Sequence, residues 1–222
     1  MSLSDTHGLH NIINVEPCDI LIHAGDFCSS ETENQVRGFV EWFVKQPATH
    51  KVFIAGNHDR IMDRLLARNA QQLRMNELVN SFSNVHYLND SGIEIEGIKF
   101  WGSPISPSFG IGWAFNRDRG DVIKRHWDMI PYDTNILITH TPVYEILDEV
   151  EDIYLNQIVR KTSVGCEELK KRIANLPNLK LHISGHIHSG YGMKNIDGVT
   201  FINASNLNEQ YEYINEPIVF NY

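Results

Sequence analysis

The sequence repeatedly places Asp, Asn or His directly after a short run of apolar residues. Near its end, Gly185-His186-Ile187-His188 follows the apolar run 179–183. In a β-strand, residues two apart point to the same side, so the imidazoles of His186 and His188 would leave the strand end together. The pair alone is a weak signal, because 11 His in 222 residues give about half a His-x-His by chance. Four further stretches support it: Asp5-Thr6-His7-Gly8, Gly25-Asp26, Gly56-Asn57-His58-Asp59 and Thr139-His140-Thr141-Pro142.

The apolar runs indicate that strands alternate with helices. The run that starts at Asp19 is too short for a helix and is stopped by Gly25, which is typical of a buried strand. Three short runs in the middle of the chain are separated by turn residues and predict antiparallel hairpins. The acidic stretch 145–160 is expected to be mobile. The expected strands are 19–24, 51–55, 85–88, 92–95, 98–101, 135–139, 179–183, 199–203 and 218–220, and the expected helices are 32–46, 60–78, 117–129 and 165–176.

Length and composition limit the possible functions. A chain of 222 residues fits one domain with a sizeable core. No apolar run approaches the ~20 residues of a membrane span and no signal peptide is visible, so a cytoplasmic protein is expected. The three cysteines form no C-x-x-C pair and are expected to be buried free thiols. The net charge of -9 disfavours a long polyanion such as duplex DNA, although bound cations can still recruit small phosphates.

Each candidate residue has an ordinary structural alternative. Asp5 and His7 lie close enough to the start to belong to a disordered terminus. Asp26 could equally cap the helix expected after it. A lone histidine after a buried strand, such as His140, is normally a core or surface residue, and His58 could be a surface residue.

Considered together, the polar residues at five strand ends suit a metal centre. They comprise two carboxylates, one amide and four imidazoles, too many for one tetrahedral zinc and about right for two ions that share a carboxylate. Mixed ligands favour Mn, Fe, Zn, Co or Ni, and we expect two divalent transition-metal ions with manganese preferred. Such a pair generates hydroxide near neutral pH and clamps the oxygens of an in-line displacement at phosphorus, so phosphoester hydrolysis is the expected use. The candidate ligands are Asp5, His7, Asp26, Asn57, His140, His186 and His188.

The ordered blocks resemble the calcineurin-like metallophosphoesterase superfamily, whose motifs read D-x-H, G-D, G-N-H-[DE], H and G-H-x-H. The resemblance covers essentially the whole chain. It implies an α/β fold, a four-layer α/β/β/α sandwich with two facing mixed sheets, in a single domain over residues 1–222. It also implies that one ion is bound by Asp5, His7, Asp26 and His188, and the other by Asp26, Asn57, His140 and His186, with Asp26 as the bridge.

The same resemblance implies catalytic roles for two further residues. His58 would be an imidazole that binds no metal and stabilises charge on the phosphoryl oxygens or protonates the leaving oxygen. Asp59 would hold that imidazole in its tautomer and orientation.

Other segments look like the metallophosphoesterase-domain-containing branch, which is similar to 239-family proteins. These segments are residues 102–104, 113–115, 185–192 and 203–208. The likeness implies phosphodiesterase activity on small substrates, including cyclic nucleotides in some members. Both His186 and His188 are present, which implies full metal binding on that side. The Gly-Asp block lacks the V-D-R-G continuation of phosphoprotein phosphatases, which argues against phosphoproteins as substrates.

The chain start departs from the family pattern. Only four residues precede Asp5, too few for a normal strand of ~5 residues, so the first strand is expected to be truncated. Asp5 and His7 would then hang from a frayed end, and one metal site would be weak.

The first hypothesis is therefore a metal-dependent phosphodiesterase acting on a small ester. Residues 102–115 and Arg117 or Arg119 would shape its pocket, while Trp113 and Phe115 are expected to pack rather than to stack on substrate. Two rivals stay open. One is a metal-binding module without catalysis, and the other is a nuclease, which would need a basic groove that the net charge of -9 does not indicate.

Overall fold

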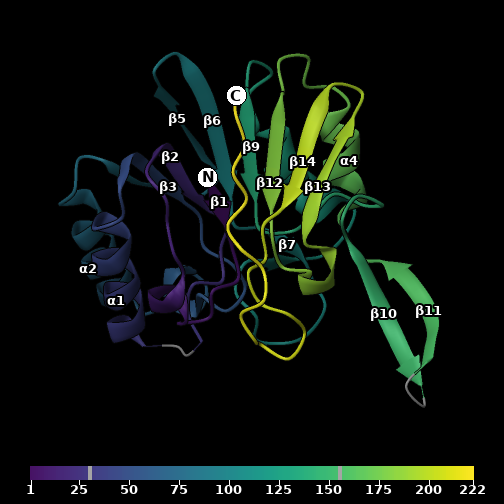
Figure 1. Ribbon diagram of the computed structural model, residues 1–222, viewed down its shortest axis with the longest axis horizontal. Coiled ribbons are helices and arrows are strands. Elements are labelled where there is room, and N and C mark those ends of the chain that lie inside the picture. The colour runs from purple at the N-terminus through teal and green to yellow at the C-terminus, as the bar shows by residue number, and fades with distance from the viewer. Residues whose placement is uncertain (30–31, 155–156) are drawn as a thin grey trace.

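Two β-sheets face each other at the centre of the molecule, and helices cover their outer sides (Figure 1). The computed structural model describes residues 1–29, 32–154 and 157–222. The four strands of the first sheet are parallel, where a mixed sheet was predicted. In sheet order they are β1 (Ser2–Leu3), β2 (Cys18–His23), β3 (Ala48–Phe53) and β4 (Val85–Tyr87).

The second sheet is mixed and has six strands in the order β13-β14-β12-β9-β6-β5. Its four inner strands are parallel, and an antiparallel strand lies at each edge. Parallel strands send their carboxyl ends to one edge, where α/β proteins place their ligands. The strands are β5 (Ser91–Ile95), β6 (Ile98–Ser103), β9 (Ile136–Thr139), β12 (Leu181–Ser184), β13 (Gly192–Ile196) and β14 (Val199–Asn203).

Helices complete the predicted α/β/β/α layers. In Figure 1, α1 (Glu33–Val44) and α2 (Asn69–Asn80) lie outside the first sheet, and α4 (Glu167–Ile173), which packs against α3 (Asp121–Asp128), lies outside the second. α1 forms because Val36, Phe39 and Phe43 recur on one buried face, and Thr32 caps its start. Within the described ranges, no helix has the length and apolar character that crossing a bilayer requires.

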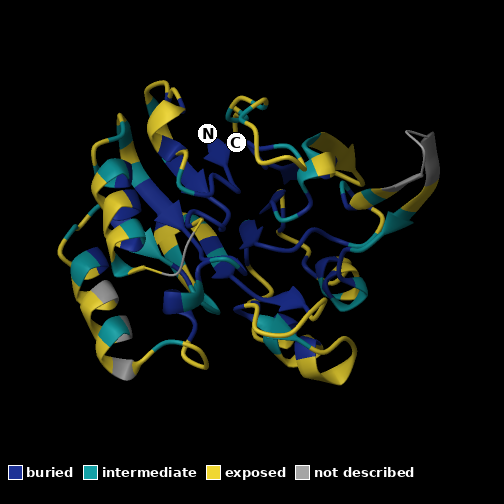
Figure 2. Cartoon of the chain, turned by 90° about the horizontal axis from the view of Figure 1, so that it is seen from below, coloured by how far each residue is buried: buried dark blue, intermediate teal, exposed yellow. Residues whose placement is uncertain are grey.

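Alternation along the strands decides which side chains lie between the sheets. Ile22 of the first sheet and Ile136 and Ile138 of the second belong to one buried apolar cluster. Leu137, which stands between Ile136 and Ile138, belongs to another cluster together with Phe53 of the first sheet. This second cluster includes residues of the helices. Both faces of the central strands are therefore buried (Figure 2), which explains the continuous apolar runs in the sequence.

Four predicted elements differ from the structure. The helix predicted over 117–129 begins at Asp121, and Arg117 belongs to a short strand, β8 (Asn116–Arg117). β4 pairs in parallel with β3 in the first sheet, so only β5 and β6 form the expected hairpin among these three strands. The helix predicted over 60–78 begins at Asn69, because a 3-10 turn, η2 (Arg60–Met62), and a bend held by the Asp63 carboxylate precede it. The strand predicted over 218–220 is reduced to an isolated bridge between Ile218 and Ser2.

Residues 145–160 were expected to be mobile, but they include most of an antiparallel hairpin. Its strands, β10 (Glu149–Tyr154) and β11 (Gln157–Ser163), project from the body of the molecule in Figure 1. Lys161 of β11 pairs with Glu151 of β10 at 2.8 Å, so basic residues of the second strand offset the acidic residues of the first. The remaining short elements are β7 (Ser106–Pro107), β8 (Asn116–Arg117), η1 (His10–Ile12) and η3 (His188–Gly190).

The start of the chain is ordered rather than frayed. Ser2 and Leu3 pair with β2 as a two-residue strand, and the main chain of Ser2 also bonds to Ile218. Asp5 and His7, which follow, are both buried. The expectation that these two side chains would hang from a loose end is therefore wrong.

Candidate metal centre

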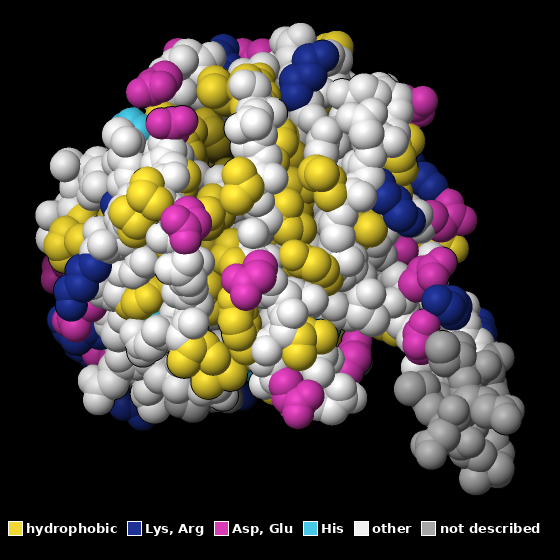
Figure 3. All heavy atoms as spheres, in the orientation of Figure 1, with side chains coloured by type: hydrophobic (Ala, Val, Ile, Leu, Met, Phe, Trp, Pro, Cys, Tyr) yellow, Lys and Arg dark blue, Asp and Glu magenta, His cyan; other side chains and the backbone are white. Residues whose placement is uncertain are grey.

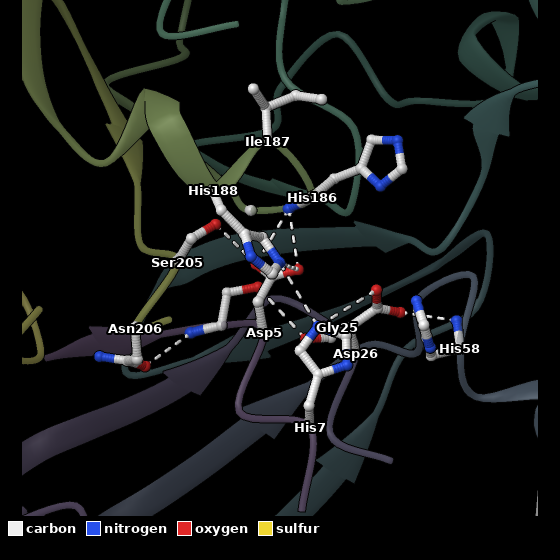
Figure 4. A network of polar contacts seen from close by, with 12 residues as sticks. Asp5, His7, Gly25, Asp26, His58, His186, Ile187, His188, Ser205 and Asn206 are labelled. Atoms are coloured by element: carbon white, nitrogen blue, oxygen red, sulfur yellow. Dashed lines mark hydrogen bonds and ion pairs between the residues drawn. The ribbon is translucent and has the colours of Figure 1, made fainter. Parts of the chain in front are cut away.

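The seven predicted ligands follow strand ends of both sheets. Asp5, Asp26 and Asn57 come after β1, β2 and β3, His140 comes after β9, and the two histidines of the Gly-His-x-His block come after β12. Figure 4 looks into the place where most of these segments meet. The structure brings all seven together, around the buried carboxylates of Asp5 and Asp26.

Asp5, His7 and His188 form a first group, whose donor atoms lie within 4.8 Å of one another. Nε2 of His188 lies 3.6 Å from Oδ1 of Asp5 and 3.4 Å from Nε2 of His7. Two imidazole nitrogens that face each other can share only one hydrogen, whereas a cation accepts a lone pair from each. The first group therefore has the donor arrangement of a cation site.

The second group consists of Asp26, His140 and His186, whose donor atoms also lie within 4.8 Å of one another. Nε2 of His140 lies 3.3 Å from Oδ2 of Asp26 and 2.9 Å from Oδ1 of Asn57. Carboxylate, amide oxygen and imidazole together are donors that divalent transition metals accept.

Asp26 lies between the two groups. Its Oδ2 atom is 3.3 Å from Nε2 of His140 and 4.0 Å from Nε2 of His7. Its Oδ1 atom accepts the backbone N–H of His58 at 2.8 Å, so Oδ2 is left to face both groups. This is the position that the predicted bridging carboxylate would occupy.

Backbone carbonyls fix the tautomers of two of the histidines. Nδ1 of His188 donates to the carbonyl oxygen of Asn208 at 2.8 Å, and Nδ1 of His140 donates to that of Ala24 at 3.0 Å. Because a carbonyl can only accept, Nδ1 carries the hydrogen in each ring and Nε2 faces the ligand group. Metal-binding histidines are held in this way, so the donor set fits two divalent ions.

The charges in the cluster depend on close carboxylate–imidazole pairs. Burial raises the pKa of the Asp5 carboxyl, but the hydrogen bond with His188 and the charges of His188, His140 and His7 together outweigh burial and hold the pKa well below its usual value. Burial likewise disfavours the charged form of the Asp26 carboxyl, but His140 lowers its pKa. Burial alone would lower the pKa of His140 and His188, yet Asp26 and Asp5 raise them to about 9. The carboxylates are thus ionised in advance, and a cation would replace protons on the imidazoles.

Four of the seven predicted ligands have a left-handed backbone, which is found at seven other non-glycine residues of the described chain. Asp5, His7, Asp26 and His186 have φ angles of 52°, 40°, 56° and 69°. A left-handed backbone is rare outside glycine, costs roughly 1–3 kcal/mol per residue and persists where the surroundings enforce it. The strain lies where strand ends turn to direct side chains to a common point, as expected for a functional site.

The calcineurin-like phosphoesterase family model matches residues 2–190 of the chain. The chain belongs to this family. Human metallophosphoesterase domain-containing protein 1 is 35% identical over 231 residues, which cover 98% of this chain and 68% of its own length. A UPF0046 protein of Caenorhabditis elegans is 35% identical over 224 residues, which cover 98% of this chain and 73% of its own. A Staphylococcus aureus structure described as a 5′-nucleotidase covers 100% of this chain and 54% of its own, at 11% identity and a TM-score of 0.49.

These matches confirm both resemblances predicted from the sequence, that to the calcineurin-like superfamily and that to the metallophosphoesterase-domain-containing branch. Family membership indicates a metal-dependent phosphoester hydrolase, and the His and Asp clusters supply candidate metal ligands for this activity.

Two glycines of this phosphoesterase leave room for the carboxylates. A Cβ atom on Gly185 would lie 2.1 Å from Oδ2 of Asp5 and from Oγ of Ser4. A Cβ atom on Gly56 would lie 2.3 Å from Oδ1 of Asp26. Glycine is needed at both strand ends because the backbone passes directly beside a carboxylate oxygen.

We expect Gly185→Ala to lower the free energy of unfolding by about 1–3 kcal/mol and to weaken Mn²⁺ binding at least ~10-fold, because the methyl group must displace Asp5 or Ser4. Chemical denaturation and isothermal titration calorimetry measure the two effects. Gly38→Ala in α1 is the control, because its Cβ atom meets nothing within 4 Å and stability should rise by roughly 0.5–1 kcal/mol. Wild-type stability and affinity for Gly185→Ala would contradict the close contact.

Asp59 holds the backbone rather than the His58 ring. Its Oδ2 atom accepts the N–H groups of Asp26 and Gly56 at 2.9 and 2.8 Å, and its Oδ1 atom accepts that of Cys28 at 2.9 Å. Both oxygens are therefore used to tie the loop after β2 to the loop after β3. The predicted role of Asp59, orienting the His58 imidazole, is corrected accordingly.

The His58 ring lies beside the first group and is half-buried. Its centroid is 4.6 Å from that of His7 and 4.7 Å from that of Trp113. A ring nitrogen of His58 lies within 4.8 Å of the donor atoms of His7 and Asp26. The ring can therefore reach a group bound above Asp26.

Sequence reasoning did not single out three residues that touch the centre, although Phe109 lies in the segment 102–115 that was expected to shape the pocket. Oγ of Ser205 donates to Oδ2 of Asp5 at 2.7 Å. The rings of Phe109 and Tyr211 lie 5.2 Å from His186 and 4.9 Å from His7. In the sequence, residues 203–208 were noted only for their likeness to the metallophosphoesterase-domain-containing branch. Nothing in the local sequence indicates that Ser205 bonds to a residue 200 positions away.

Ser205→Ala should weaken Mn²⁺ binding by about 10-fold and leave stability within ~1 kcal/mol, because the hydroxyl orients a carboxylate that would bind metal. Calorimetric titration with Mn²⁺ checks this result. Ser184→Ala is the matched control, since this buried hydroxyl donates to the carbonyl of Ile202 instead. Equal Mn²⁺ affinities of the two variants would remove the role of Ser205.

The two arginines expected to shape the pocket have other partners. Arg119 donates to the carbonyl oxygens of Gly165 and Val164 at 2.8 and 2.7 Å, near the start of α4. Arg117 donates to the carbonyl oxygen of Asn116 at 2.8 Å. These contacts give both guanidinium groups a structural role.

Proposed function

We propose that this phosphoesterase hydrolyses small phosphodiesters with two divalent ions that share Asp26. The observation that carries the proposal is the position of Oδ2 of Asp26, 3.3 Å from Nε2 of His140 and 4.0 Å from Nε2 of His7. These histidines belong to different ligand groups. A carboxylate oxygen between two ligand groups is the arrangement that two-ion displacement at phosphorus requires.

The ligand sets proposed for the two ions combine nitrogen and oxygen donors, which favours Mn, Fe, Zn, Co or Ni, with manganese preferred. When bound, two such ions lower the pKa of water and neutralise charge on the attacking and leaving oxygens. One set is Asp5, His7, Asp26 and His188, and the other is Asp26, Asn57, His140 and His186.

His58 is the catalytic residue in this proposal. Its backbone N–H holds Oδ1 of Asp26, while its ring stays free to face a substrate. An imidazole at this place can donate a hydrogen to a phosphoryl oxygen or to the leaving oxygen. Because Asp59 is occupied with backbone donors, the neighbouring rings of His7 and Trp113 support the His58 ring.

The surroundings of the centre favour a phosphodiester. A cavity of about 150 Å³ opens beside His186 and His188 and is lined by Val150 and Tyr211 among others. On another side, Trp113 covers the His58 ring and is itself partly exposed. A diester carries an organic group on each side of phosphorus. The cavity, whose lining also includes Ile187 and Glu209 and is thus part polar, offers a contact for one group, and the Trp113 ring offers a contact for the other. Small diesters, including cyclic nucleotides, are therefore the proposed substrate class.

The net charge of -9 and the face drawn in Figure 3 give little support to a nuclease. On the described part of the face in Figure 3, Lys and Arg are scattered among acidic and apolar side chains and form no continuous patch. A protein that binds a polyanion needs such a patch to neutralise phosphates. Small esters require only local neutralisation, which two ions would supply.

The proposal is tested by comparing esters on the Mn²⁺-loaded protein. Bis-p-nitrophenyl phosphate and a cyclic nucleotide should be hydrolysed at least ~10-fold faster than p-nitrophenyl phosphate, and EDTA should abolish turnover. Two bound Mn²⁺ ions without turnover of any ester would indicate a metal-binding module instead. Preferential nicking of plasmid DNA would indicate a nuclease.

A further inference from the structure

His23, the last residue of β2, is fully buried and lies outside the three groups of possible ligands found in the described residues. Its ring packs among aromatic rings, with centroids 6.0 Å from Phe27, 4.9 Å from Phe39 and 6.4 Å from Phe43. A polar ring in an apolar cage is costly unless its nitrogens have partners. The hydrogen-bond partners of the two ring nitrogens therefore explain why a histidine occupies this position.

Both nitrogens of His23 are hydrogen-bonded, and the bonds define one tautomer. The backbone N–H of Gly25 donates to Nδ1 at 3.2 Å. Because an amide N–H can only donate, Nδ1 carries a lone pair, and the hydrogen of the neutral ring is on Nε2. Nε2 then donates to Oγ1 of Thr6 at 3.1 Å. Burial lowers the pKa of His23 to about 3, so the ring stays neutral.

The two partners of His23 belong to the two loops that carry Asp5, His7 and Asp26. Thr6 stands between Asp5 and His7, and Gly25 directly precedes Asp26. The loops run side by side, because the N–H of Asp5 donates to the carbonyl oxygen of Gly25 at 2.9 Å and that of His7 donates to Asp26 at 3.0 Å. These two loops contain Asp5, His7 and Asp26, which all have a left-handed backbone. Such a backbone persists only where surrounding residues hold it in place.

We propose that His23 is a positioning residue that fixes the loop carrying Asp5 and His7 against the loop carrying Asp26. The inference rests on the proposed two-ion function, because it concerns the spacing of those ligands. The ring reaches the two loops from the helix side of the first sheet and contacts neither ions nor substrate. Its effect is transmitted through Thr6 and Gly25 alone.

The test compares variants that keep or remove each hydrogen bond. His23→Phe keeps the aromatic packing and removes both bonds. His23→Asn can keep an acceptor near Nδ1 for Gly25, and His23→Gln can keep a donor near Nε2 for Thr6. Thr6→Val removes the hydroxyl, and Thr6→Ser retains it. Phe43→Leu is the control, because it loosens the same aromatic cage while its ring packs against Phe39, Trp42 and Phe53, which lie outside both loops.

Each variant is titrated with MnCl₂ by calorimetry, and its thermal midpoint is measured without metal. We expect His23→Phe to weaken Mn²⁺ binding by about 10- to 100-fold, as for residues that orient metal ligands. Phe43→Leu, at a similar loss of stability, should stay within ~2-fold of wild type. Thr6→Val should resemble His23→Phe, and the double variant should be no weaker than either single one. Partial recovery in His23→Asn, His23→Gln and Thr6→Ser completes the expected pattern.

Wild-type Mn²⁺ affinity in His23→Phe would overturn the inference and leave His23 as a packing residue. The same conclusion would follow if Phe43→Leu weakened binding as much as His23→Phe. A wild-type chain that bound Mn²⁺ but hydrolysed no ester would overturn the proposed function while leaving the affinity comparison intact. Failure of the wild type to bind Mn²⁺ would overturn both.

Discussion

Asp26→Asn should reduce turnover of a phosphodiester by about 10³-fold or more and lower the Mn²⁺ content from two ions to one or none. The substitution keeps the size of the side chain and an oxygen for the His58 amide. It removes the negative charge from the atom that lies 3.3 Å from His140 and 4.0 Å from His7.

Metal analysis after gel filtration and a rate measurement at saturating Mn²⁺ check this prediction together. Asp19→Asn is the matched control, because Asp19 is an exposed carboxylate of the same strand, β2, near its opposite end. The control should match the wild type within ~2-fold. Two tightly bound Mn²⁺ ions in Asp26→Asn would show that this carboxylate is not shared.

His58→Ala should lower turnover by about 10²- to 10⁴-fold while both ions remain bound. Alanine retains the backbone N–H that holds Oδ1 of Asp26 at 2.8 Å, so the bridging position is preserved. Only the imidazole is lost, and with it a hydrogen-bond donor near the leaving oxygen. The decrease should appear in kcat, because the interaction strengthens in the transition state.

Steady-state kinetics and metal analysis on the same preparation separate this result from a metal effect. His50→Ala serves as the control, because His50 lies half-buried beside His86 near the start of β3. The predicted ligand on this strand, Asn57, follows its opposite end. Loss of metal in His58→Ala would make His58 a ligand instead. Unchanged turnover with metal retained would remove its catalytic role.

The strand ends could be predicted because their signal is local. Each is a short apolar run stopped by glycine or by a polar residue, and parallel pairing sends such ends to one edge without further information. This logic selected the seven candidate ligands that the structure brings together, whereas the roles of His58 and Asp59 came from the family resemblance. Roles within the cluster were harder to predict, as Asp59 shows: three backbone N–H groups determine its use, and the sequence does not reveal them.

Pairing between distant segments could not be predicted. β4 has the same apolar alternation whether it pairs with β5 or β3, and its register with β3 is fixed by contacts such as that of Leu88 with the carbonyl of Phe53. The partnership of Ser205 with Asp5 depends on a parallel bridge between Ser4 and Ser205. The helix predicted over 60–78 was placed too early, because the Asp63 carboxylate caps a bend that propensity alone does not disclose.

The predicted ligands are divided between the two sheets: Asp5, Asp26 and Asn57 follow strands of the first, while His140, His186 and His188 follow strands of the second. Ions held by both sets would cross-link the two halves of the sandwich at their shared edge. A site occupied at 100 times its dissociation constant adds about 2.7 kcal/mol to the free energy of unfolding. Chelation should therefore loosen the whole sandwich as well as stop the chemistry.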